Sequence, residues 1–271
     1  MASASASLRY FVKAQWCRLS GIAGGLPVPP RKLTWLVAGH HDVVKSLRNG
    51  QRTAENIRET LTRAGLRVED FTELLDFGCG SGRVLRNWQS LKTTRVHGTD
   101  YNEEHIRWCR RHLPFAEFSR NDLRPPLEWP DESFAFVYAC SVFTHLDEPL
   151  QYAWMRELRR ILKPGAFLLF TTHGHRWLPS LSDAEKAAFQ EGQLVVRNSA
   201  DSGRNECSVY HPVEYVRTRL AEGFAVVDHV PEGATGTGRL AGHHDPRLAE
   251  GDAAAPTRSH SARRGAWRRS L

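Results

Sequence analysis

The sequence predicts an α/β protein with a Rossmann-like, doubly wound and mostly parallel sheet. Five strand-like segments alternate with helical patterns over residues 70–172, the order that builds a parallel sheet covered by helices. The fourth of these segments, Phe134 to Cys140, is continuously apolar, as expected of a strand buried on both faces. A chain of 271 residues is long enough to bury the core of one such domain.

The first predicted strand ends in a glycine turn that indicates a ligand site. Strand and turn read Leu74-Leu75-Asp76-Phe77-Gly78-Cys79-Gly80-Ser81-Gly82. Glycine lacks a Cβ atom, so a ligand can lie directly against the main chain of such a turn. A helix is predicted next, with free N–H groups directed at the ligand. Its apolar residues are Val84, Leu85, Trp88 and Leu91.

The spacing of these glycines separates the turn from two common nucleotide-binding motifs. A dinucleotide fingerprint needs a glycine where this chain has Arg83, and a P-loop needs a lysine that the turn lacks. The turn therefore predicts a nucleotide-like ligand of another kind. A purely structural turn is the alternative at this point.

The second predicted strand ends in another carboxylate, Asp100, twenty-four residues after Asp76. Asp100 could cap the helix that follows. Asn102 suits that position better, because acidic residues follow it in the first turn of the helix. We therefore expect Asp100 to face a ligand.

Three further strands complete the pattern. The third, Phe115 to Ser119, leads to Asn121-Asp122-Leu123, which could also be a simple turn before two prolines. The fourth is followed by an amphipathic helix predicted from Glu148 to Lys163. The segment Leu162-Lys163-Pro164-Gly165 then turns the chain into the fifth strand, Ala166 to Thr172.

Taken in order, these motifs resemble the class I methyltransferases that use S-adenosylmethionine, over roughly residues 50–235. The resemblance implies that S-adenosylmethionine is the cofactor and that the glycine turn takes its methionine part. It also implies that Asp100 accepts both ribose hydroxyls, since two adjacent donors match two carboxylate oxygens, and that Asp122 and Leu123 meet the adenine. The cofactor residues it implies are Asp76, Gly78, Cys79, Gly80, Gly82, Asp100, Tyr101, Asp122, Leu123 and Cys140. No metal is implied.

The acceptor is predicted to be a small molecule methylated on oxygen or nitrogen. Ligands of open parallel sheets bind outside the carboxyl ends of the strands, where the long segment 173–223 would shape the acceptor pocket. An oxygen acceptor needs a base near neutral pH, and His145, His173 and His175 all follow strands at that edge. Each could equally be a loop or capping histidine, and a nitrogen or carbon acceptor can do without a base.

Two other functions stay open. A protein or peptide methyltransferase would need an open acidic groove, and a non-catalytic cofactor-binding protein would have its acceptor space filled. Enzymes that methylate the amino groups of DNA bases typically carry an Asn/Asp-Pro-Pro-aromatic motif after the fourth strand. This chain reads Cys140 to Leu146 at that place, so methylation of DNA bases is disfavoured.

The chain divides into three predicted parts. Residues 1–52 form a lid or linker, with a helix over the cofactor site, although this acid-poor, arginine- and serine-containing start also resembles an organellar transit peptide. Residues 53–238 form the cofactor-binding domain, whose first helix begins near Thr53 and whose sixth strand is Phe224 to Val230. Residues 239–271 lack periodicity and predict a disordered basic tail, so that the usual seventh strand would be missing.

Composition limits the partners. The formal net charge is +7, of which the tail supplies +4 from seven arginines and three acids; no basic, aromatic groove remains to predict nucleic acid binding. No apolar run is long enough to span a membrane, so no membrane partner is expected. The five scattered cysteines fit a reducing compartment and exclude a disulfide framework or zinc site. We expect a cytoplasmic monomer or weak homodimer.

Overall fold

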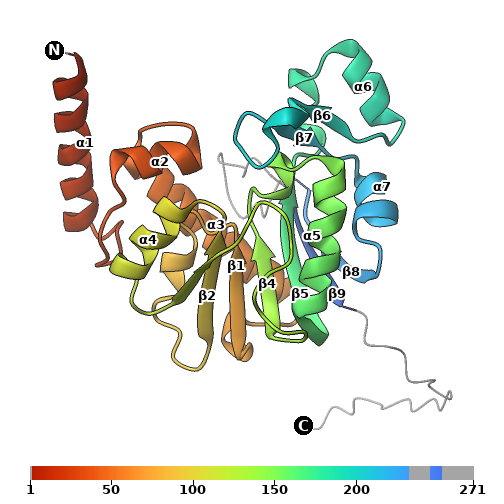
Figure 1. Cartoon of the computed structure of the whole chain (residues 1–271), viewed down its shortest axis with the longest axis horizontal. Coiled ribbons are helices and arrows are strands. Elements are labelled where there is room, and N and C mark those ends of the chain that lie inside the picture. Colours follow the sequence, from red (N-terminus) through yellow and green to blue (C-terminus); the bar gives the residue numbers. More distant parts are fainter. Residues whose placement is uncertain (1, 232–244, 252–271) are drawn as a thin grey trace, which may run out of the picture.

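The computed structural model describes residues 2–231 and 245–251, and its centre is a seven-stranded sheet. The strand order is β3-β2-β1-β4-β5-β9-β8 (Figure 1). Strands β3, β2, β1, β4 and β5 are parallel, and β9 runs antiparallel to both β5 and β8. The strands of this sheet are β1 Glu73–Phe77, β2 Arg95–Asp100, β3 Glu117–Arg120, β4 Phe134–Ala139, β5 Leu162–Thr172, β8 Phe224–His229 and β9 Asp245–Gly251. The predicted doubly wound α/β class is confirmed.

Helices cover both faces of the sheet. The α-helices are α1 Ala2–Leu19, α2 Arg31–Ala38, α3 Val43–Arg63, α4 Glu103–His112, α5 Glu148–Ile161, α6 Asp183–Gln190 and α7 Val213–Tyr215, the last continuing as a π-helical turn, Val216–Leu220. Short 3-10 helices are Val68–Asp70, Leu85–Trp88, Phe143–His145, His175–Ser180 and Ser199–Asp201. None of the described helices is long and apolar enough to cross a bilayer.

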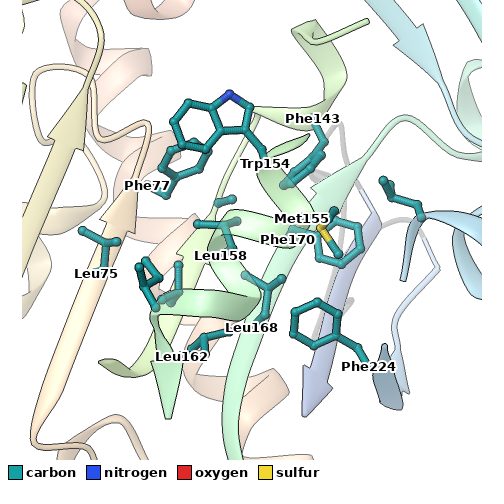
Figure 2. Packing of buried hydrophobic residues seen from close by; sticks show 14 of the residues in the cluster. Leu75, Phe77, Phe143, Trp154, Met155, Leu158, Leu162, Leu168, Phe170 and Phe224 are labelled. Atoms are coloured by element: carbon teal, nitrogen blue, oxygen red, sulfur yellow. The ribbon is translucent and has the colours of Figure 1, made fainter. Parts of the chain in front are cut away.

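Successive side chains along each strand point to opposite faces of the sheet, which divides the core into two layers. Leu74 and Phe136 belong to the cluster packed beneath α3 and α4, whereas their neighbours Leu75 and Val137 belong to the cluster packed beneath α5. Figure 2 shows the second layer, where Trp154 of α5 lies over Phe77 with ring centroids 4.6 Å apart. Burial on both faces explains why β4 is apolar without interruption.

The seventh strand is present, so the expectation that it is missing was wrong. Strand β9 pairs with β5 from Phe167 to Thr172 and with β8 on its other side. The side-chain pattern of 245–251 does not predict a strand. Backbone pairing with the strands on both sides forms it instead. The remainder of the predicted tail, and residues 232–244, lie outside the described residues.

Two helices differ from their predictions. The helix expected from Thr53 begins at Val43, ten residues earlier, because Asp42 caps it by accepting a 3.2 Å hydrogen bond from Lys45 N. The helix expected after the glycine turn is only a 3-10 turn, Leu85–Trp88. There the Asn87 amide donates to the carbonyls of Arg83 and Val84, and such local bonds compete with a regular helix.

The predicted insertion 173–223 forms a small subdomain beside the carboxyl end of the sheet (Figure 1). Its two-stranded sheet pairs β6 Val195–Arg197 with β7 Ser208–Tyr210. A capping box of Ser182 and Glu185 starts α6, and Pro212 precedes α7.

Candidate active site

A cavity of about 610 Å³ lies at the carboxyl ends of β1, β2 and β4. Its floor is the glycine turn, and its walls are the residues that follow β2, β3 and β4. Its roof consists of residues 35–37 and 39, in and after α2, together with residues 203–206 of the insertion. The volume lies in the range of pockets that enclose metabolites.

The glycine turn is shaped by close packing as well as by positive φ angles. Gly80 has φ +53°, and its N–H donates a 2.8 Å hydrogen bond to Asp100. Gly82 has φ +69°, and a Cβ atom there would lie 2.4 Å from the Leu113 side chain that follows α4. Gly78 and Gly80 line the cavity, whereas Gly82 does not. The alternating glycines therefore serve two purposes, an open floor and a tight contact with the chain after α4.

Asp100 is fixed at the cavity wall by main-chain donors. One carboxylate oxygen accepts from Gly80 N and the other from Asn102 N, each at 2.8 Å. Each oxygen retains a further lone pair, so the carboxylate can still accept two ligand hydroxyls. Asn102 is the cap of α4, as predicted, since its side chain accepts from Glu104 N at 2.9 Å.

Asp76 is a second carboxyl at the cavity, but a buried one. Its side chain is 2 % exposed, and Oδ2 has no hydrogen-bond partner. Burial raises the pKa of Asp76 to about 7, and the Tyr138 hydroxyl and the Arg83 charge only partly oppose that rise. A buried carboxyl oxygen without a partner is costly in a protein alone and is a good partner for a bound cation.

Two cavity residues escaped the sequence analysis. Arg83 lines the cavity, and within the described part of the chain no hydrogen bond or ion pair holds its guanidinium. Burial lowers its pKa, as expected of an unpaired buried cation. His105 of α4 also lines the cavity, and its Nδ1 is buried without a partner. Arg83 could have been found from its position directly after Gly82, the last glycine of the turn. Nothing in the sequence pattern indicated His105.

The adenine-side prediction is met by one of its two residues. Leu123 lines the cavity, as does Asn121, but the Asp122 side chain is 85 % exposed and lies 3.7 Å from Arg120 outside it. The Asn121 side chain is held by the Thr99 hydroxyl, which donates a 2.8 Å hydrogen bond to Oδ1. Asn121 is therefore the polar residue that the structure brings to this wall.

The other predicted cofactor residues, Tyr101, Cys79 and Cys140, all line the cavity. Burial raises the pKa of both thiols, which keeps them protonated and unreactive. Cys79 is therefore a small side chain that the turn accommodates rather than a reactive thiol.

The structure separates the predicted histidines. His145 lines the cavity, and its Nδ1 lies 2.7 Å from the carbonyl oxygen of Cys207. His173 is buried among Trp177 and Tyr210, with Nδ1 3.1 Å from the Val209 carbonyl, and is not among the residues that line the cavity. His175 packs its ring against Phe189, 5.2 Å between centroids.

The roof is tied together by main-chain and side-chain hydrogen bonds. The Asn205 amide donates to the Leu36 carbonyl at 2.9 Å, which joins the insertion to α2. Gly203 N donates to the His145 carbonyl at 2.6 Å. The insertion therefore overhangs the cavity as predicted, but the part of the N-terminal segment over the cavity is α2; among the described side chains of α1, none lines the cavity.

Known proteins share this fold and these motifs. A family model described as a methyltransferase domain matches residues 74–165. A ubiquinone/menaquinone biosynthesis C-methyltransferase of Chromobacterium violaceum is 30 % identical over 71 % of this chain and 82 % of its own length. A malonyl-[acyl-carrier protein] O-methyltransferase of Halalkalibacterium halodurans is 28 % identical over 47 % of this chain, which spans about half the length of that relative (49 %).

A solved S-adenosylmethionine-dependent methyltransferase of Clostridium acetobutylicum superposes with a TM-score of 0.54 at 14 % identity, over 74 % of this chain and 91 % of its own. This structural likeness shows the fold, and the sequence matches show the family. The chain belongs to the class I methyltransferases that use S-adenosylmethionine.

The residues present fit that cofactor. Asp76 would offer its buried oxygen to the ammonium group, Asp100 its carboxylate to the ribose, and Arg83 its cation to the carboxylate. A side chain at Gly80 would place its Cβ atom 2.7 Å from Val37, so the floor of the cavity depends on glycine there.

Proposed function

We propose that this protein transfers the methyl group of S-adenosylmethionine to a small-molecule acceptor, on oxygen or nitrogen. The observation that carries the proposal is the single cavity of about 610 Å³, whose lining includes the glycine turn, Asp100 and also His145. The cofactor supplies a methyl carbon that is already electrophilic, so the protein has mainly to position the two reactants and exclude water.

Each polar wall residue has a separate task in this proposal. Asp100 accepts the ribose hydroxyls, Asp76 faces the ammonium group, and Arg83 pairs with the carboxylate. Asn121 and Leu123 border the adenine. Asp122, assigned to the adenine by resemblance, does not line the cavity, so the proposal gives it no contact with the cofactor.

We assign the general base for an oxygen acceptor to His145. The Cys207 carbonyl can only accept a hydrogen bond, so Nδ1 of the neutral ring carries the proton and Nε2 is left as the acceptor. Burial lowers the pKa of His145, which keeps the ring neutral at physiological pH. His173 does not line the cavity, so its contribution would be to hold the neighbouring ring, 6.3 Å away between centroids.

The two alternative functions fit less well. A peptide substrate needs an open groove, and residues of α2 and the insertion roof this cavity and are joined through Asn205. A binding protein without turnover would have its acceptor side filled. The two relatives described above are named as a C-methyltransferase and an O-methyltransferase, which supports catalysis without fixing the acceptor atom.

A metabolite screen with methyl-labelled S-adenosylmethionine tests the proposal. We expect at least one extracted metabolite to gain the labelled methyl mass with the wild-type protein and to gain it far more slowly with His145→Gln. Asp183→Asn, on the exposed surface of α6, is the matched control and should transfer label at the wild-type rate. Label that appears only on protein, or on no molecule although the cofactor binds, would contradict a small-molecule acceptor.

A further inference from the structure

Helix α1 presents an apolar outer surface to solvent. Its exposed apolar residues are 45–88 % exposed and follow the spacing of one helix side. We call them the outer stripe, which consists of Leu8, Phe11, Val12, Trp16 and Leu19. In Figure 1 the helix stands at the edge of the molecule, beside α2 and α4 rather than over the sheet.

The opposite side of α1 is anchored, so the outer stripe has a fixed direction. Cys17 is fully buried in a cluster with Val43 and Leu47 of α3. The Tyr10 hydroxyl bonds the Thr34 hydroxyl at 2.7 Å, and a 2.7 Å salt bridge joins Lys13 to Asp42. Rotation of the helix to hide the stripe would break all of these contacts.

The part of the chain that carries the stripe is strongly basic. The first 54 residues contain eight cations and a single acid, a net charge of +7 that equals the formal charge of the whole chain. The basic residues are Arg9, Lys13, Arg18, Arg31, Lys32, Lys45, Arg48 and Arg52, and the acid is Asp42. The exposed Arg48 lies over the Trp16 ring, 5.6 Å from its centroid, which places a cation directly beside the stripe.

We propose that α1 is a membrane-surface helix whose outer stripe lies in the interface of a bilayer with anionic headgroups. Leucine and aromatic side chains on one face with lysine and arginine around them are what such an interface binds. A second copy of this chain would bring together two segments of +7 each, and nucleic acid offers no apolar surface for five such side chains. The sequence-based expectation of no membrane partner considered only spanning segments. Because none of the described side chains of α1 lines the cavity, this proposal stands independently of methyl transfer.

Co-sedimentation of the full-length protein with vesicles tests the proposal. We expect binding to vesicles of phosphatidylcholine with phosphatidylserine, weakened by salt, and much weaker binding to phosphatidylcholine alone. Val12→Glu should weaken the binding by about tenfold or more, since it adds an anion and removes apolar area. Val227→Glu is the matched control: the same change at an exposed valine of β8, 45 % exposed, should leave binding unchanged.

Folding is checked separately, by the affinity of each variant for S-adenosylhomocysteine. Equal binding to both vesicle types, or to neither, would overturn the proposal. So would a concentration-dependent dimer that Val12→Glu abolishes without any vesicle binding, because the stripe would then belong to a second copy. A protein isolated from its own cells that begins after residue 19 would also overturn it, since α1 would be a removed targeting segment.

Discussion

Asp76 couples the protonation of the cavity to its ligand. The carboxyl has a pKa near 7 because it is buried, so the free protein holds a proton there below that pH. A cationic ligand favours the carboxylate and must expel the proton. We therefore expect the affinity for S-adenosylmethionine to rise as the pH increases to about 7 and to level off above it.

Calorimetry in buffers of different ionisation enthalpy measures this proton release directly. Asp76→Asn, which keeps the shape and cannot ionise, should bind more weakly at pH 8 and show no proton release. If the variant shows the same pH dependence as the wild-type protein, another group is responsible.

Arg83 should discriminate cofactors by their carboxylate. Arg83→Gln removes a charge-assisted pair and should weaken S-adenosylmethionine binding by about tenfold or more. Decarboxylated S-adenosylmethionine lacks the partner group, so its affinity should be nearly equal for wild-type and variant. A similar loss for both ligands would show that Arg83 acts on the shape of the glycine turn rather than on the carboxylate.

His145 should govern the acid side of the pH–rate profile for an oxygen acceptor. A base works when neutral, and burial holds the pKa of His145 below its usual 6.5. The kcat measured with saturating cofactor should therefore be independent of pH above 6.5 and should fall only as the pH drops through that lowered pKa. His145→Gln should lower kcat by about 100-fold or more with cofactor affinity preserved. An unchanged kcat would point to an acceptor that needs no base.

At the scale of elements, the glycine turn is fixed by its neighbours. Gly82→Ala adds a methyl group 2.4 Å from the Leu113 side chain at a positive φ angle. Gly65→Ala shares the positive φ angle but meets nothing within 4 Å. Urea unfolding should show a loss of about 1 kcal/mol for Gly65→Ala and a larger loss, about 2–4 kcal/mol, for Gly82→Ala. Equal losses would mean that contact with Leu113 does not matter.

Local sequence patterns predicted the elements that neighbouring residues determine. They did not predict features that depend on packing against distant parts of the chain. The continuously apolar strand β4 and the Asn102 cap of α4 depend on neighbouring residues, and both were predicted. The early start of α3 was not, because Gly50 interrupts the helical pattern. In the structure a side chain there would overlap Arg83 O, at 2.0 Å from the Cβ position, so close packing of α3 on the glycine turn explains that glycine.

For the whole molecule, topology explains why the site was only partly predictable. The carboxyl ends of parallel strands meet at one edge, so Asp76, Asp100 and Leu123 could be placed together from the sequence. A residue that reaches the cavity by packing, such as His105, carries no sequence pattern. Like His105, β9 was not indicated by its own residues; its pairing with β5 and β8 comes from two open backbone edges.

The central claim is that the cavity above the glycine turn holds the adenosyl cofactor through Asp100. Calorimetric titration with S-adenosylhomocysteine, on wild-type protein and on Asp100→Asn, tests it most directly. We predict saturable one-to-one binding to the wild-type protein and an affinity about tenfold or more weaker for the variant. Folded wild-type protein that gives no binding heat, or equal affinities for the two proteins, would contradict the account.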